Sequence, residues 1–124
     1  MITWIPWDNN HALFGAGRQE APSLSLVEIT DLWPLIRFLM DDPVYEAQYQ
    51  AYCQEVVETV FVPEEMTEIY TTYHELVAPY VLAETLEATT LSSEQAFDRS
   101  LQNLIDHVNE RYEAVLDYLA NQNN

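Results

Sequence analysis

The sequence contains no lysine, and its only basic side chains apart from three histidines are four arginines, against 21 acidic residues. The formal net charge is therefore −17 at neutral pH. A surface this acidic repels phosphate backbones and anionic lipid headgroups. We therefore expect neither nucleic acid nor a membrane surface as a partner. The charge favours either simple solubility or a basic protein partner.

Cysteine and glycine are also scarce. The single cysteine, Cys53, excludes an internal disulfide and a multi-cysteine zinc site, and its place on an apolar helical face indicates a buried, unreactive thiol. The two glycines form Gly15-Ala-Gly17, which lacks the third glycine of a dinucleotide-binding loop. No apolar run approaches the length needed to span a membrane.

The residues that are present favour helices. Of the 124 residues, 48% are hydrophobic, which is enough for one domain with a core. Residues 2–5 fit a short strand and residues 6–25 an irregular loop, after which the apolar period becomes helical. The sequence therefore predicts an all-α fold. It is a small antiparallel bundle of one short and three longer helices over residues 26–124, preceded by a strand and loop remnant over residues 1–25.

Local signals place the first two helices. Thr30 or Asp31 can cap a short helix whose first turn tolerates Pro34. Asp42 should cap the second helix, with Pro43 at its first position, because proline needs no hydrogen-bond donor there.

Proline also shapes the third helix. Val62 and Pro63 mark its start, and the two glutamates that follow stabilise the positive end of its dipole. Pro79 predicts a kink near Ala78, with helix resuming toward Thr85 or Leu86, because proline removes one backbone hydrogen bond and crowds the preceding turn.

The last helix has the clearest pattern. Ser92 and Gln95 resemble a capping box at its start. Apolar residues at spacings of three and four then mark one face of each long helix. The three predicted stripes are Tyr45, Tyr49, Tyr52, Cys53, Val56, Val57 and Val60; Met66, Ile69, Tyr70, Tyr73, Leu76, Val77 and Tyr80; and Phe97, Leu101, Leu104, Ile105, Val108, Tyr112, Val115, Leu116 and Leu119.

The bundle histidines do not suggest a metal centre. Di-iron bundles use Glu-x-x-His, but Thr71 and Leu104 stand three residues before His74 and His107. We expect both histidines at the edge of the core, bonded to a nearby carboxylate or carbonyl.

The chemistry-bearing candidate lies near the start of the chain. Trp4, Ile5 and Trp7 lead directly into Asp8 and the Asn-Asn-His that follows. One interpretation is a strand end with an Asx turn, in which Asp8 bonds local backbone amides. The other is that Asp8 gives a carboxylate oxygen to a divalent cation such as Mg²⁺ or Mn²⁺, with Asn10 adding an amide oxygen. Two ligands do not complete such a site, so the remaining ligands would come from elsewhere.

Several segments resemble one family, the CotH-type spore-coat kinases, which are atypical and often secreted protein kinases. Trp4-Ile-Pro-Trp-Asp8 with Leu13-Phe-Gly15 resembles the family's Trp-Asp-x-Asp segment and the glycine after it. The likeness continues over nearly the whole chain, in Trp33 through Tyr45, in Phe61 with Pro63-Glu-Glu-Met66, and in Phe97 through Arg111.

The resemblance implies that this chain is the C-terminal helical part of such a protein and buttresses an upstream kinase-like core. Asp8 would then hold the cation on the nucleotide phosphates, although Asn10 stands where the family often has a second acid. ATP with Mg²⁺ or Mn²⁺ is implied only for the full-length protein, which could be an ATP-dependent kinase, and not for this segment alone. A secreted or cell-envelope location follows only from the resemblance. The alternative function is a stand-alone acidic helical module for protein–protein interaction.

Overall fold

The predicted all-α architecture is confirmed by the computed structural model, which describes residues 23–85 and 91–122. Within these residues there are four α-helices and no strand. They are α1 (Pro34–Met40), α2 (Pro43–Thr59), α3 (Pro63–Val81) and α4 (Glu94–Gln122). One helix is short and three are longer, as the sequence predicts. The strand and loop predicted for the start of the chain lie outside the described residues, apart from residues 23–25.

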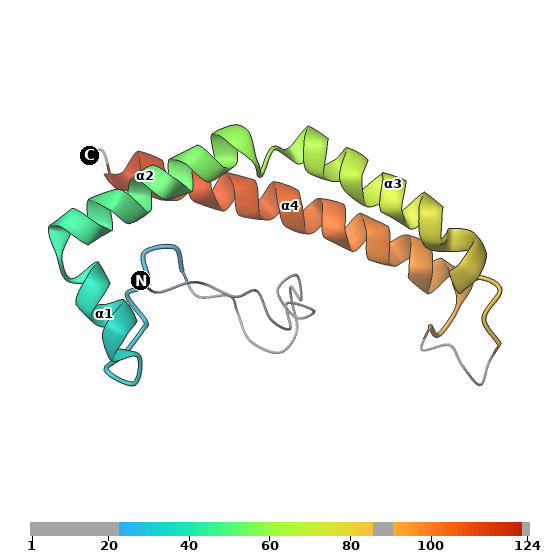
Figure 1. Cartoon of the computed structure of the whole chain (residues 1–124), viewed down its shortest axis with the longest axis horizontal. Helices are drawn as coiled ribbons and strands as arrows, with labels where there is room; N and C mark the ends of the chain where they lie inside the picture. The colour runs from blue at the N-terminus through green and yellow to red at the C-terminus, as the bar shows by residue number, and fades with distance from the viewer. Residues whose placement is uncertain (1–22, 86–90, 123–124) are drawn as a thin grey trace, which may run out of the picture.

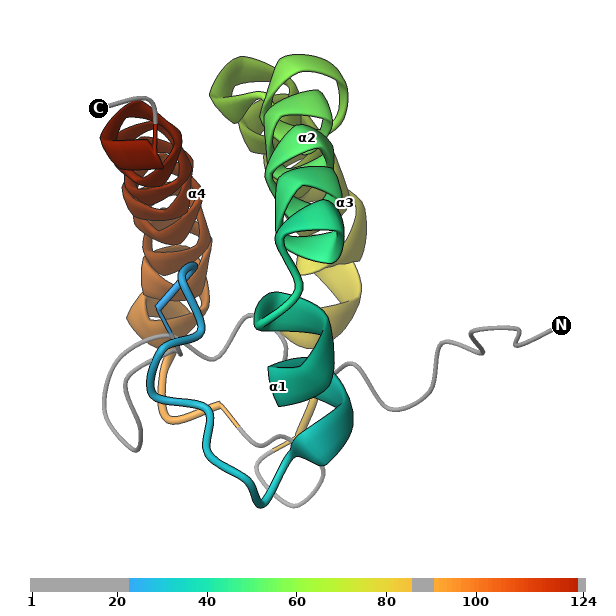
Figure 2. The same ribbon diagram turned by 90° about the vertical axis from the view of Figure 1, so that its left-hand side faces the viewer.

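The four helices form an arch rather than a compact four-helix cluster. α2 and α3 follow one another along the length of α4 and run opposite to it, while α1 turns away from the outer end of α2 (Figure 1). The perpendicular view shows α4 lying beside the α2–α3 layer (Figure 2). α4 packs against both α2 and α3, whereas α1 packs against α2. At 1.5 Å per residue, the 29 residues of α4 extend about 43 Å, enough to reach both partners.

The start of α2 confirms the predicted cap. Asp42 is extended, and its Oδ1 accepts a hydrogen bond from the amide of Val44 at 2.8 Å, with Pro43 at the first helical position. The cap predicted for α1 is wrong. Trp33 occupies the cap position without a side-chain cap bond, and the hydroxyl of Thr30 instead accepts from the amide of Leu32 at 3.4 Å.

The predicted start of α3 is confirmed at Val62 and Pro63. Its predicted continuation toward Thr85 is wrong, because α3 passes Pro79 and ends at Val81. Pro79 lies two residues before that end, and its ring removes one backbone hydrogen bond and crowds the preceding turn.

The capping box predicted for α4 is displaced by one residue. The amide of Ala96 donates to Ser93 Oγ at 3.2 Å, so Ser93 rather than Ser92 caps a helix that begins at Glu94. The two serines are adjacent and chemically equal, and the backbone entering the helix selects between them.

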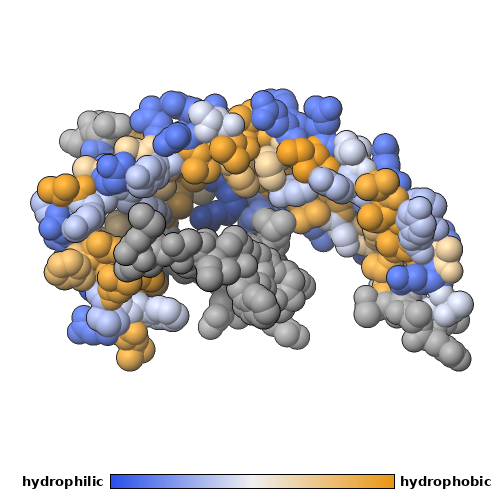
Figure 3. All heavy atoms as spheres, viewed as in Figure 1, coloured by the Kyte–Doolittle hydropathy of each residue, from blue (hydrophilic) through white to orange (hydrophobic). Residues whose placement is uncertain are grey.

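The buried core is small and lies along α4. Val57 of α2 and Val108 and Tyr118 of α4 are the buried hydrophobic residues among those described, and Val108 is 0% exposed. The ring of Tyr49 packs on that of Tyr118 with centroids 6.2 Å apart. Many other large apolar side chains remain exposed, and hydrophobic residues cover much of the visible face of the arch (Figure 3). One layer of α2 and α3 on α4 buries only part of the apolar surface that the sequence carries.

Candidate functional site

The metal ligands suggested by the sequence, Asp8 and Asn10, lie outside the described residues, so their role stays a prediction. Within residues 23–85 and 91–122, no group of three or more His, Cys, Asp or Glu side chains is arranged to hold a metal ion.

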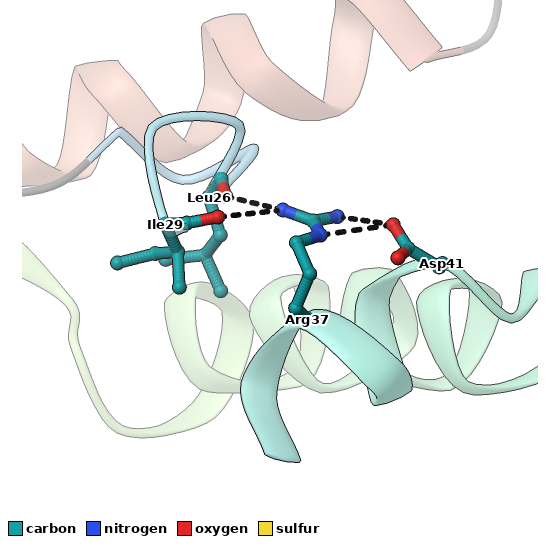
Figure 4. A network of polar contacts seen from close by, with 4 residues as sticks. All are labelled: Leu26, Ile29, Arg37 and Asp41. Carbon is teal, nitrogen blue, oxygen red and sulfur yellow. Dashed lines mark hydrogen bonds and ion pairs between the residues drawn. The ribbon is translucent and has the colours of Figure 1, made fainter. Parts of the chain in front are cut away.

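Arg37 connects α1 to the turn that precedes it. From α1, Arg37 Nη1 donates to the carbonyl of Leu26 at 2.8 Å and to that of Ile29 at 3.5 Å (Figure 4). Its Nε and Nη2 reach Asp41 Oδ1 at 2.9 and 2.7 Å. Because the guanidinium presents several donors in a fixed plane, it can fasten the preceding turn to α1. The i,i+4 spacing of Arg37 and Asp41 is visible in the sequence, but no pattern announces the two carbonyl acceptors.

The turn held by Arg37 is conformationally strained. Leu26 has φ of 52°, in the left-handed region that is unfavourable for a residue with a branched side chain. Hydrogen bonds across the turn stabilise it. The Ser23 hydroxyl donates to Glu28 Oε2 at 2.6 Å, and the Ser23 amide donates to Glu28 Oε1. These hydrogen bonds, the Ser23 hydroxyl first, lower the pKa of Glu28 below its usual value. The turn is therefore fixed by polar contacts at both ends.

A groove of about 400 Å³ lies between this turn and the end of α4. Its lining offers a guanidinium, three hydroxyls and two amides as polar groups, with no carboxylate among its described residues. The lining residues are Ser23, Leu24, Ser25, Arg111, Ala114, Tyr118, Asn121 and Gln122. This set can hold a polar group but contains no nucleophile paired with a base, so it does not define an active site.

The single cysteine lies in an aromatic cluster between α2 and α4. The sequence predicts a buried thiol at Cys53. The side chain is only half-buried, and it is a free thiol. Burial, followed by the neighbouring Cys53, raises the pKa of Tyr49. Burial also raises the pKa of Tyr118, although the nearby Gln50 side chain offsets part of that rise. No described group makes a hydrogen bond of good geometry to the buried Tyr118 hydroxyl. The surroundings favour the neutral forms, which suits a structural cluster.

At the other end of α4, His74 lies against the helix start. Its ring stacks on Phe97 with centroids 3.9 Å apart, and its Nε2 lies 3.7 Å from Asp98 Oδ1. The predicted place at the core edge is observed, since the side chain is mostly buried beside a carboxylate. However, Nε2 is too far from Asp98 for a hydrogen bond and has no other described partner.

The described residues thus form an acidic helical scaffold in which Arg37 holds the turn before α1. Among them there is no complete set of catalytic residues or metal ligands. None of its helices is both long and apolar enough to cross a membrane.

A model of the family described as CotH kinase protein matches residues 1–115, and the chain belongs to that family. The matched range includes Asp8 and all four helices except the last turns of α4. No curated protein and no solved structure matches the chain.

Proposed function

We propose that this chain is the C-terminal helical segment of a CotH-like protein and that it buttresses a kinase-like core supplied by an upstream part of the protein. The observation that carries the proposal is the family match over residues 1–115. The chain has no lysine, so the nucleotide-positioning lysine of a kinase would come from the upstream part, together with the catalytic aspartate. The many exposed apolar side chains support a buttress, since they offer a surface that a neighbouring domain can cover.

In this proposal Asp8 binds the Mg²⁺ or Mn²⁺ that accompanies ATP in the full-length protein, and Asn10 contributes a neutral oxygen. Hard cations of this kind take oxygen ligands and keep phosphate oxygens in their shell. Phosphoryl transfer requires several parts to be positioned together. The 124-residue chain alone should therefore neither bind ATP usefully nor transfer phosphate.

The test compares Asp8→Asn with Asp31→Asn in a protein that includes the upstream segment. We expect Asp8→Asn to lower Mn²⁺- and ATP-dependent phosphorylation by at least about a hundredfold, as befits loss of a metal ligand. Asp31→Asn, an exposed aspartate in the turn before α1, should leave it unchanged. The proposal is wrong if the isolated chain shows a clear Mn²⁺- and ATP-dependent thermal shift or phosphorylates a serine substrate.

The second candidate function is a stand-alone acidic module that binds another protein. The extent of exposed apolar surface supports this candidate equally well. The translated sequence upstream of Met1 separates the two. A paired lysine and glutamate followed by an aspartate with a nearby asparagine supports the kinase-like core, and a native start at Met1 supports the stand-alone module.

A further inference from the structure

α3 carries more apolar surface than its contact with α4 uses. Tyr70 and His74, which are half-buried, belong to the side that contacts α4. A second row, here named the α3 stripe, consists of Ile69, Tyr73, Leu76 and Tyr80, which are 44%, 62%, 60% and 75% exposed. Their spacings of four, three and four place them on one helical face. A helix with a single neighbour needs only one such face, so the α3 stripe indicates a second neighbour.

α2 extends the same surface. Tyr45, Tyr52 and Val56 are 50%, 58% and 46% exposed, and each comes immediately before a buried or half-buried residue of the side of α2 that packs on α4. The α3 stripe has the same offset, since Ile69 and Tyr73 come immediately before Tyr70 and His74.

One residue corresponds to about 100° of rotation, in the same sense in both helices. Because α2 and α3 run in the same direction along α4, both rows lie on the same side of the arch (Figure 1).

The charge around this surface has one sign. The α2–α3 layer, residues 43–81, contains no lysine or arginine. Its acidic residues are Glu46, Glu55, Glu58, Glu64, Glu65, Glu68 and Glu75. A second copy of the chain would bring the same negative charge to the contact, and like charges across an interface are unfavourable. A partner with basic residues beside its apolar contact would be attracted instead.

We propose that the α3 stripe, continued by the exposed row of α2, docks an amphipathic α-helix whose apolar face is flanked by lysine and arginine. The stripe is about 16 Å long, because its eleven-residue span rises 1.5 Å per residue, and it matches about three turns of a partner helix. The partner packs beside α3 in the way that α4 does on its other side, and its basic flanks lie near the glutamates of the layer. This inference goes beyond the proposed function, since the surface exists whether or not the partner helix belongs to a kinase-like core.

The test uses two synthetic helical peptides of about five turns that share a leucine face. One carries lysines beside that face and the other carries glutamates. Fluorescence anisotropy should show binding of the lysine peptide to the 124-residue chain, weakening as salt is added, and no binding of the glutamate peptide.

The double variant Tyr73→Ser/Leu76→Ser should weaken the lysine peptide by at least about tenfold, since it removes apolar contact and keeps every charge. Val44→Ser is the matched control, because Val44 is 73% exposed but lies outside both rows. Circular dichroism checks that each variant keeps its helices.

Three results would overturn the proposal. Equal binding of both peptides would show that the basic flank is irrelevant. Equal weakening by Val44→Ser and by the double variant, or none by either, would show that the α3 stripe is not the docking surface. Self-association of the chain that the double variant abolishes would make a second copy the occupant.

Discussion

In the core, the buried hydroxyl of Tyr118 reduces the stability that its ring contributes. Tyr118 is 8% exposed, and its hydroxyl has no hydrogen-bond partner among the described residues. Leaving a buried hydroxyl unsatisfied costs free energy, whereas the ring itself contributes apolar contact with Tyr49. The stabilising part of Tyr118 is therefore its ring.

Tyr118→Phe tests this assignment. We expect the free energy of unfolding at pH 7 to stay within about 1 kcal/mol of the parent or to rise, because only the unsatisfied hydroxyl is removed. The folded state raises the pKa of Tyr118 above its usual value of 10.0, so the associated stability is present below pH 10 and is lost as pH rises further. The variant should therefore lose less stability than the parent as pH rises above about 10.

Urea unfolding followed by circular dichroism at both pH values measures the difference. Tyr80→Phe, at a tyrosine that is 75% exposed, should unfold like the parent at pH 7. A loss of several kcal/mol in Tyr118→Phe would mean that its hydroxyl has a stabilising partner after all.

At the scale of elements, α1 and the turn before it behave as one unit. The turn contains Leu26 at positive φ, and the carbonyl of that same residue accepts from Arg37 of α1. Strained backbone persists only where surrounding contacts over-determine it. The arginine therefore holds a conformation that the turn would not favour by itself.

Arg37→Met keeps an apolar stem and removes every donor of the guanidinium. We expect faster hydrogen exchange at the amides of Leu26 and Ile29, which close the turn through the carbonyls of Ser23 and Leu26. The melting temperature should fall by only a few degrees, because α1 lies at the edge of the structure.

Asp41→Asn is the matched control for this prediction. It removes the ion pair and leaves both carbonyl contacts of Arg37 in place, so exchange in the turn should change little. Equal exchange in Arg37→Met and the parent would show that the turn is stable without the arginine.

Element by element, the sequence predicted what depends on short-range chemistry. Asp42 before Pro43 and Val62 before Pro63 mark helix starts because a cap side chain and a proline act within one turn. The choice of Ser93 over Ser92 depends on the path of the chain, which neither residue determines.

The predicted apolar stripes are only partly buried, for a different reason. Tyr45 and Tyr49 fit the same helical period, yet Tyr49 packs on Tyr118 of α4 while Tyr45 is 50% exposed, because the apolar arc is wider than the face that one neighbour covers. For the candidate site, the sequence alone provides Asp8 and Asn10, while the acceptors of Arg37 come from a turn without any recognisable pattern.

At the scale of the whole molecule, charge and exposed apolar area act together. The chain carries a net charge of −17 on a two-layer arch with a small core. Self-repulsion of this size destabilises a compact state, and dissolved salt screens it. Much of the fold's stability in dilute buffer is therefore offset by its own charge.

We expect the melting temperature to rise when NaCl is increased from about 0.01 to 0.5 M, as the screening length shortens from about 30 Å to well under 10 Å. Glu75→Gln on α3 should raise the melting temperature at low salt and lose that advantage at high salt. A neutral osmolyte at the same osmolality is the control for changes in solvent activity. A melting temperature independent of salt would contradict the charge argument.

The break between α2 and α3 has a mechanical consequence. These two helices do not pack on each other. Their alignment depends on α4, which contacts both of them. Bending α4 therefore changes the angle between α2 and α3. A docked helix that spans the joint between them on one side would resist that bending. We expect such bending to concentrate at residues 60–62, which join the two helices.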